Sequence, residues 1–115
     1  MNPSALILLL RTKPQNIEFN QVIEVITQYY VYHPTCFSNG GLVNEPGTNE
    51  GSCKIFYFAQ IHQLSAAETL HLFGDYYRKD VLAHANSNDH GNIRNFMATG
   101  WQGIIFAGQA LIERD

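Results

Sequence analysis

Residues Gly74 to Gly103 read GDYYRKDVLAHANSNDHGNIRNFMATGWQG and hold acids, bases, amides and aromatic rings more densely than any other part of the chain. A polar break at residues 86–89 separates two segments with helical spacing of apolar residues. Asp89 can cap the second of these helices, and Gly100 is placed to end it. We therefore expect two helices joined by a polar turn here, and we expect any functional site to lie in this stretch.

The segments before this stretch also favour helices. Residues Ala5 to Arg11 are almost all apolar helix formers, which predicts a short helix buried on several sides. A second apolar stripe with helical spacing begins at Phe19, and this helix is expected to stop before Pro34 because a proline restricts the residue that precedes it. Ser52 is expected to open a third helix.

A fourth helix is marked by Ser65-Ala66-Ala67-Glu68, which is a capping box. Leu70, Phe73 and Tyr77 supply its inner stripe, so this helix is expected to continue through Tyr77. Gly74 lies inside that range and indicates the close approach of a neighbouring segment.

Two other segments favour strands. Asn39-Gly40-Gly41 is typical of a hairpin tip, and residues 104–112 are apolar and partly β-branched, which favours a strand that pairs with the hairpin near residues 37–43. The sequence thus predicts one α+β domain over residues 1–115. This domain is mainly helical, with about five helices and a small antiparallel hairpin or sheet.

Composition narrows the classes of function. The formal net charge is −3 and the seven Lys and Arg residues are scattered, so no basic stripe exists for nucleic acid. The early apolar run is too short to cross a membrane, and two cysteines do not make a disulfide framework. We expect a cytoplasmic protein with no cofactor and no nucleic-acid or membrane partner.

A catalytic hypothesis rests on Cys53. This cysteine follows Gly51-Ser52 at a predicted helix start, where unpaired amides, the helix dipole and Lys54 favour a thiolate. With His90 as base and Asp89 orienting it, Cys53 would make a small thiol-dependent enzyme. The alternative is that Cys53 is an inert core residue.

The loop from Gly47 to Lys54 superficially resembles a phosphate loop, but the Gly-Lys-Ser/Thr order is absent and Glu50 is negative, which excludes a nucleotide. A small anion at the loop amides remains open. The dispersed histidines and aspartates show no metal-ligand motif, so we expect no metal.

A binding hypothesis rests on polar and aromatic residues of the loop after the hairpin and of the helices on both sides of the polar turn. If these segments pack side by side, their acids can hold Arg78 and Arg94 in charge-assisted pairs. The alternative is a structural polar network without a ligand. The candidate binding residues are Asn44, Glu45, Lys54, Asp75, Tyr76, Tyr77, Arg78, Asp80, Asn92, Arg94 and Asn95.

Three segments, FGDYYRKDVL (Phe73 to Leu82), DHGNIRNFMATGWQGIIFAGQAL (Asp89 to Leu111) and GLVNEPGTNEGSCKIFYFAQ (Gly41 to Gln60), resemble the HopJ type III effector family. The resemblance covers the chain from Phe19 onward. It implies a small bacterial protein whose pathogen members are thought to enter host cells through a type III secretion system. It supplies no catalytic residues.

These observations leave three hypotheses. The first is a binding or interaction module whose partner is a host or bacterial protein, exported by a type III system if it is a true effector. The second is the thiol-dependent enzyme. The third is a housekeeping protein that is not secreted, which an N-terminal helix packed into the core would support.

Overall fold

Helices make up most of the chain, which the computed structural model describes from residue 1 to residue 115. The helical elements are α1 (Pro3–Thr12), η1 (Pro14–Asn16), α2 (Phe19–Tyr29), α3 (Glu50–Ile61), α4 (Ala66–His71), η2 (Tyr76–Val81), α5 (Gly91–Thr99) and η3 (Gly100–Gly103). Of these, η2 is a π-helix, and η1 and η3 are 3-10 turns. The fold is α+β and mainly helical, as the sequence predicts.

The strands are short and form two antiparallel sheets. They are β1 (Tyr30–Tyr32), β2 (Phe37–Asn39), β3 (Leu42–Asn44), β4 (Ile104–Phe106) and β5 (Leu111–Glu113). One sheet has the order β3-β2-β4, with Ser38 opposite both Val43 and Ile105, and the other pairs β1 with β5. The predicted hairpin and its pairing with the C-terminal segment are therefore confirmed.

The second helix ends before Pro34, as predicted, since α2 stops at Tyr29. The sequence does not predict β1, which takes Tyr30 to Tyr32 into a pairing with β5. The single strand expected over residues 104–112 is split, and its halves belong to different sheets. Aromatic and β-branched residues pair readily in strands, so this long-range pairing overrides the local helical pattern.

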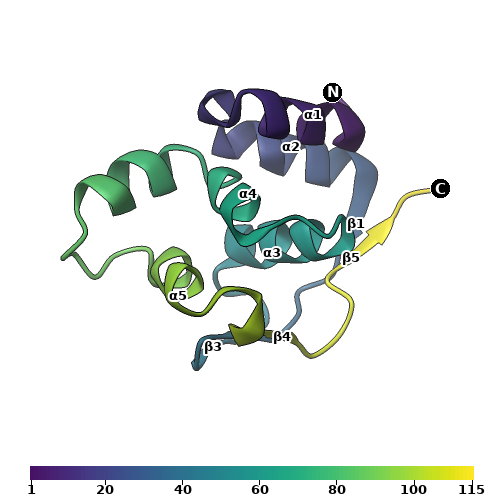
Figure 1. Cartoon of the computed structure of the whole chain (residues 1–115). Coiled ribbons are helices and arrows are strands. Elements are labelled where there is room, and N and C mark those ends of the chain that lie inside the picture. Colours follow the sequence, from purple (N-terminus) through teal and green to yellow (C-terminus); the bar gives the residue numbers. More distant parts are fainter.

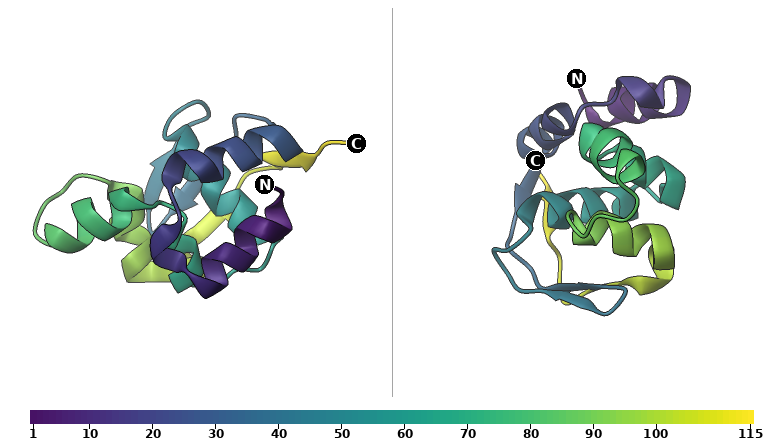
Figure 2. Two further views of the ribbon diagram at one scale, coloured as in Figure 1. Left: turned by 90° about the horizontal axis from the view of Figure 1, so that it is seen from above. Right: turned by 90° about the vertical axis from the view of Figure 1, so that its left-hand side faces the viewer.

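The elements stack in three levels around α3. Figure 1 shows α1 and α2 at the top, α3 and α4 in the middle, and α5 with the three-stranded sheet below, and the right view of Figure 2 shows the same order. Phe56 of α3 is fully buried, and its ring lies 4.9 Å from Phe96, 5.3 Å from Phe73 and 6.0 Å from Phe37, measured between ring centroids. Phe56 thus joins α3 to the levels around it in one core.

Helix α1 is amphipathic, not buried on several sides as expected. Leu6 and Leu10 are 0% and 2% exposed, whereas Leu8 on the opposite face is 64% exposed. Arg11 also pairs with Glu68 of α4 at 3.0 Å. The N-terminal helix is therefore docked into the fold along one face.

The predicted capping box is present: Ser65 Oγ accepts from the amide of Glu68, and Glu68 Oε1 accepts from the amide of Ser65. The helix it starts is shorter than expected, since α4 ends at His71 and Gly74 has a φ of 60°. A Cβ on Gly74 would lie 2.8 Å from the backbone nitrogen of Phe19. The close approach is confirmed, and it interrupts the helix that the sequence predicts as continuous.

Candidate functional site

A pocket of ≈370 Å³ lies where α3 and α5 begin. Its volume is in the range of small-molecule sites. The start of α3 lines it with Asn49, Gly51 and Ser52, and the start of α5 lines it with residues 90–93. A wider hollow of ≈880 Å³ runs along α2 and includes Asn20 and Gln21 at the start of that helix, but no histidine lines it.

Both helices begin in the same way. Asn49 and His90 are the N-cap residues, both lie in the left-handed region with φ of 49° and 52°, and neither caps its helix through its side chain. By contrast, α1 is capped by the Asn2 side chain. The side chain of Ser65 caps α4. The starts of α3 and α5 therefore open into the pocket without a side-chain cap.

The first intrahelical bonds of these helices run from the amide of Cys53 to the carbonyl of Asn49 and from the amide of Arg94 to the carbonyl of His90, which is the usual pattern of an α-helix. Among the amides before them, those of the five pocket-lining residues Gly51, Ser52, Gly91, Asn92 and Ile93 find no acceptor in the protein. We call these five groups the helix-start amides. Two of these amides belong to Gly51 and Gly91, which have no side chain that could cover them.

The expectation that Asp89 caps α5 is wrong. His90 is the N-cap, and Asp89 Oδ1 instead accepts from Nη2 of Arg94 at 2.7 Å. This hydrogen bond holds the pKa of Asp89 below its usual value. Arg94 also donates to the carbonyls of Asp89 and Ala85, so it fixes the turn before α5 and leaves the helix-start amides open.

A buried asparagine cluster connects the hairpin to both helix starts. Asn39, Asn44 and Asn92 are 0%, 1% and 6% exposed. Nδ2 of Asn39 and Nδ2 of Asn44 each donate to Oδ1 of Asn92 at 3.1 Å, and Nδ2 of Asn92 donates to Oδ1 of Asn44 at 2.9 Å. Asn49 donates to Asn44, and Asn95 donates to the carbonyl of Asn39. The cluster holds α3 and α5 at a set separation.

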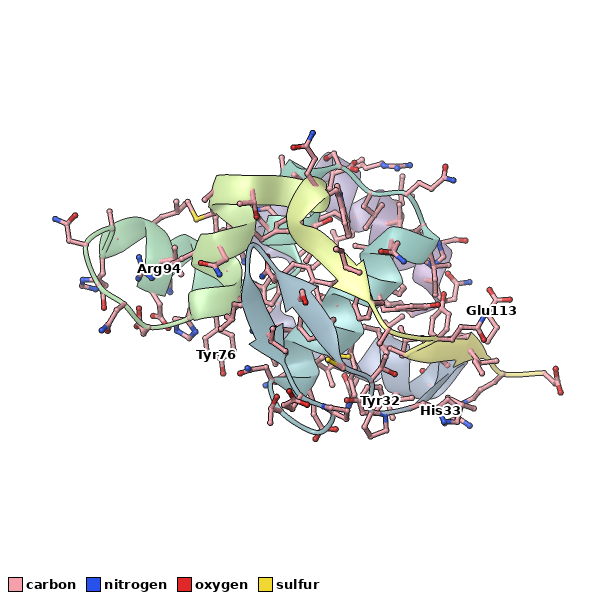
Figure 3. The ribbon with its side chains drawn as sticks, turned by 90° about the horizontal axis from the view of Figure 1, so that it is seen from below. Tyr32, His33, Tyr76, Arg94 and Glu113 are labelled. Atoms are coloured by element: carbon pink, nitrogen blue, oxygen red, sulfur yellow. The ribbon has the colours of Figure 1, made fainter.

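Aromatic rings form one wall of the pocket. The Tyr76 ring lies 5.0 Å from the Phe19 ring and 5.2 Å from the imidazole of His90, measured between centroids. Tyr76 is 44% exposed, and in Figure 3 it lies at the same end of the molecule as Arg94, away from Tyr32, His33 and Glu113. The pocket thus combines a ring wall with backbone donors.

His90 is held by carboxylates. Its Nε2 lies 3.0 Å from Asp80 Oδ2 and 3.9 Å from Asp89 Oδ2. No Lys or Arg lines the pocket. The positive potential at this site therefore comes from the helix-start amides and, when it is protonated, from His90.

Arg78 and the residues near it serve the fold instead of the pocket. Its guanidinium donates to the carbonyls of Pro14, Ile17 and His71, and it lies 3.9 Å from Asp75, which also pairs with Lys79. The Tyr77 ring packs against His71. These candidates lie near the pocket wall but do not line it.

Cys53 does not meet the requirements of the catalytic hypothesis. Its side chain is 1% exposed, burial raises the pKa of the thiol, and Sγ contacts the carbonyl of Thr35 at 3.6 Å. No hydrogen bond joins it to His90, and Lys54 lies over the Tyr32 ring with Nζ 4.6 Å from the centroid. His90 lies 3.9 Å from Asp89, but Cys53 is not hydrogen-bonded to His90.

Glu45 is exposed, and its carbonyl accepts from Thr48 in the turn before α3. It does not line the pocket. No group of three or more His, Cys, Asp or Glu side chains is placed to hold a metal ion. No helix is long and apolar enough to span a membrane.

The pocket lining contains some of the residues that the sequence predicts for binding and others that it does not predict. Tyr76 and Asn92 are predicted for binding and line the pocket, as does His90, whereas Phe19 and Gly91 are not predicted. The sequence also indicates a possible anion site at the loop amides before Cys53. A glycine directly after a polar turn and before an apolar stripe, as at Gly91, is the signal that could have pointed to the second helix start.

Comparison with known proteins agrees with the resemblance seen in the sequence. The family model described as HopJ type III effector protein matches residues 4–111. The chain belongs to the HopJ family. The HopJ fold also occurs in a crystal structure described as that of the "unknown function protein VPA0580", which is 44% identical. The similarity covers 99% of this chain and 95% of that one, with a TM-score of 0.97. No curated protein matches the sequence.

Proposed function

We propose that this HopJ protein is a binding module that takes a small ligand with a carboxylate or carbonyl head in the pocket between α3 and α5. The observation that carries the proposal is that the helix-start amides of two helices line one cavity of ≈370 Å³. Unpaired amides at a helix start favour a negatively charged or hydrogen-bond-accepting group, and here two sets of them converge.

The charge of the site favours a single negative charge over a phosphate dianion. Tight phosphate sites usually add Arg or Lys to the backbone donors, and neither residue lines this pocket. Glu50 at the first position of α3 adds negative charge nearby. A carboxylate meets these conditions because it needs only a few donors and carries one charge.

The ring wall supports a ligand with an apolar or planar body. Phe19, Tyr76 and His90 stand together in the pocket lining, and the Tyr76 ring is accessible. Rings at these separations pack favourably against another ring or an aliphatic chain. The expected ligand therefore has an acidic or carbonyl head and an apolar body of a few carbon atoms.

Calorimetric titration of the full chain with benzoate, benzyl alcohol and inorganic phosphate tests this proposal. Benzoate is expected to bind, and benzyl alcohol, which has the same ring without the charge, is expected to bind about 10-fold more weakly. Tyr76→Ala should weaken benzoate binding. Leu82→Ala should not, since Leu82 is 50% exposed on the neighbouring segment and outside this pocket. Equal affinities for benzoate and benzyl alcohol would contradict the proposal.

A role inside the cell that makes the protein is the second candidate, against export as an effector. The docking of α1 favours it, since Leu6 and Leu10 are buried in the core and a folded N-terminal helix is a poor free signal. A reporter fused behind residues 1–20 should stay inside a bacterium with an active type III system. Secretion of that reporter would favour the effector role. A protein partner, of the host or of the bacterium, stays a prediction.

A further inference from the structure

We infer that the same pocket hydrolyses carboxylic esters, with His90 as general base and Asp80 as its positioning residue. This inference rests on the proposed function, because the ester must occupy the pocket with its carbonyl at the helix-start amides. It needs neither cysteine. It therefore differs from the thiol mechanism that the sequence suggests.

The pair of His90 and Asp80 has the geometry of a base and its orienting group. Asp80 Oδ2 lies 3.0 Å from Nε2 of His90. An ionised carboxylate can only accept a hydrogen bond, so in the neutral imidazole Nε2 carries the proton and Nδ1 keeps its lone pair. No hydrogen bond occupies Nδ1, and the imidazole lines the pocket. His90 can therefore accept a proton from a water molecule in the pocket.

The helix-start amides supply the second requirement, which is stabilisation of an oxyanion. Backbone N–H groups aimed at developing negative charge are the usual oxyanion hole of acyl transfer. The asparagine cluster fixes the two helix starts, so these donors need no rearrangement when charge develops. Phosphoryl transfer fits less well, because it relies on metal ions or on Arg and Lys near the phosphate, and no Arg or Lys lines this pocket.

The reaction balances without an added oxidant or reductant. Nδ1 of His90 takes a proton from water while the water oxygen bonds to the ester carbonyl carbon, and the carbonyl electron pair moves to the oxygen held by the amides. The intermediate then collapses, the bond to the alcohol oxygen breaks, and the alcohol leaves with the proton from Nδ1. The products are an alcohol and a carboxylic acid, whose carboxylate is the head group that the pocket binds.

The test measures turnover of 4-nitrophenyl acetate and 4-nitrophenyl butyrate by the full chain between pH 5 and 9. His90→Asn is the central variant, because asparagine tolerates the left-handed conformation of this residue. It is expected to lower kcat by about 100-fold, the usual contribution of a general base. Asp80→Asn should lower kcat with little change in KM, because it removes the carboxylate that orients the imidazole.

His33→Asn is the matched control, because His33 is exposed at the far end of the molecule and any histidine can hydrolyse activated esters slowly. It should leave the rate unchanged. Equal rates in the wild type, His90→Asn and His33→Asn would overturn the inference. Benzoate titration of the same samples separates the two proposals: retained binding without His90-dependent turnover rejects hydrolysis alone, and loss of both rejects the pocket as a site.

Discussion

At the scale of single residues, the buried asparagines hold parts of the fold together through hydrogen bonds between their side chains. The sequence predicts Asn44, Asn92 and Asn95 as binding residues, yet their side chains bond to one another, to Asn39 and to Asn49. Of the three, only Asn92 also lines the pocket. The sequence predicts a structural polar network as the alternative to a ligand site, but it does not show which amides pair in three dimensions.

Replacing Asn92 by Ala should destabilise the protein by about 2–4 kcal/mol, because it removes three buried hydrogen bonds: Oδ1 of Asn92 accepts from Asn39 and from Asn44, and its Nδ2 donates to Asn44. Urea unfolding followed by circular dichroism measures the change. Asn88→Ala, at an exposed position in the turn before α5, is the control and should change stability by less than about 0.5 kcal/mol. Equal losses of stability in the two variants would show that the buried asparagine cluster does not stabilise the protein more than an exposed asparagine does.

The pair of Tyr30 and His62 predicts how stability depends on pH. Tyr30 Oη lies 2.7 Å from Nε2 of His62, and burial lowers the pKa of His62. Between that lowered pKa and the ordinary value of about 6.5, the unfolded chain binds more protons than the folded chain, so stability falls as the pH drops below about 6.5. His71, whose pKa is also lowered by burial, contributes in the same direction.

His62→Gln keeps a hydrogen-bond acceptor for Tyr30 but does not titrate, so the loss of unfolding free energy between about pH 7 and pH 5 should be smaller in this variant than in the wild type. Unfolding midpoints in urea at several pH values measure it. Identical pH slopes in the two proteins would mean that His62 is not kept neutral by the fold.

At the scale of elements, the sequence predicts the features that depend on neighbouring residues, but it does not predict which distant segments pair as strands. The capping box at Ser65, the hairpin tip at Asn39-Gly40 and the helix end at Gly100 can be predicted because each depends on neighbouring residues only. Strand β1 is missed because its partner β5 lies about 80 residues away. The sequence assigns the cap of α5 to Asp89 because the competing partner Arg94 can be recognised only in the folded structure.

Substitution of Gly74 tests whether the close approach of α2 interrupts the fourth helix. Gly74→Ala should cost about 3 kcal/mol or more, because it combines a positive φ with a Cβ that would lie 2.8 Å from the Phe19 backbone nitrogen. Gly41→Ala is the matched control, since Gly41 also has a positive φ but a Cβ added there would meet no atom within 4 Å, and it should cost only about 1–2 kcal/mol. A smaller loss at Gly74 than at Gly41 would contradict the close approach of α2.

At the scale of the whole molecule, the pocket is assembled from segments that the sequence keeps apart. Phe19, Leu42, Ser52, Tyr76 and His90 reach it from five different parts of the chain. The sequence places the loop before α3 and the region around α5 in one candidate site, but it cannot show that both helices begin uncapped at a common cavity. That property depends on three-level packing around α3 and on the asparagine cluster.

Binding of a carboxylate in the pocket between α3 and α5 is tested most directly by titrating ¹⁵N-labelled protein with benzoate and following ¹⁵N–¹H correlation spectra. The account predicts saturable shifts of the Gly51, Gly91 and Asn92 amides with one common affinity, because a carboxylate in the pocket accepts hydrogen bonds from the helix-start amides. The amide of Gly108, outside the pocket, should not move. If the amides of Gly51 and Gly91 stay unchanged at saturating benzoate, the pocket between α3 and α5 is not the binding site.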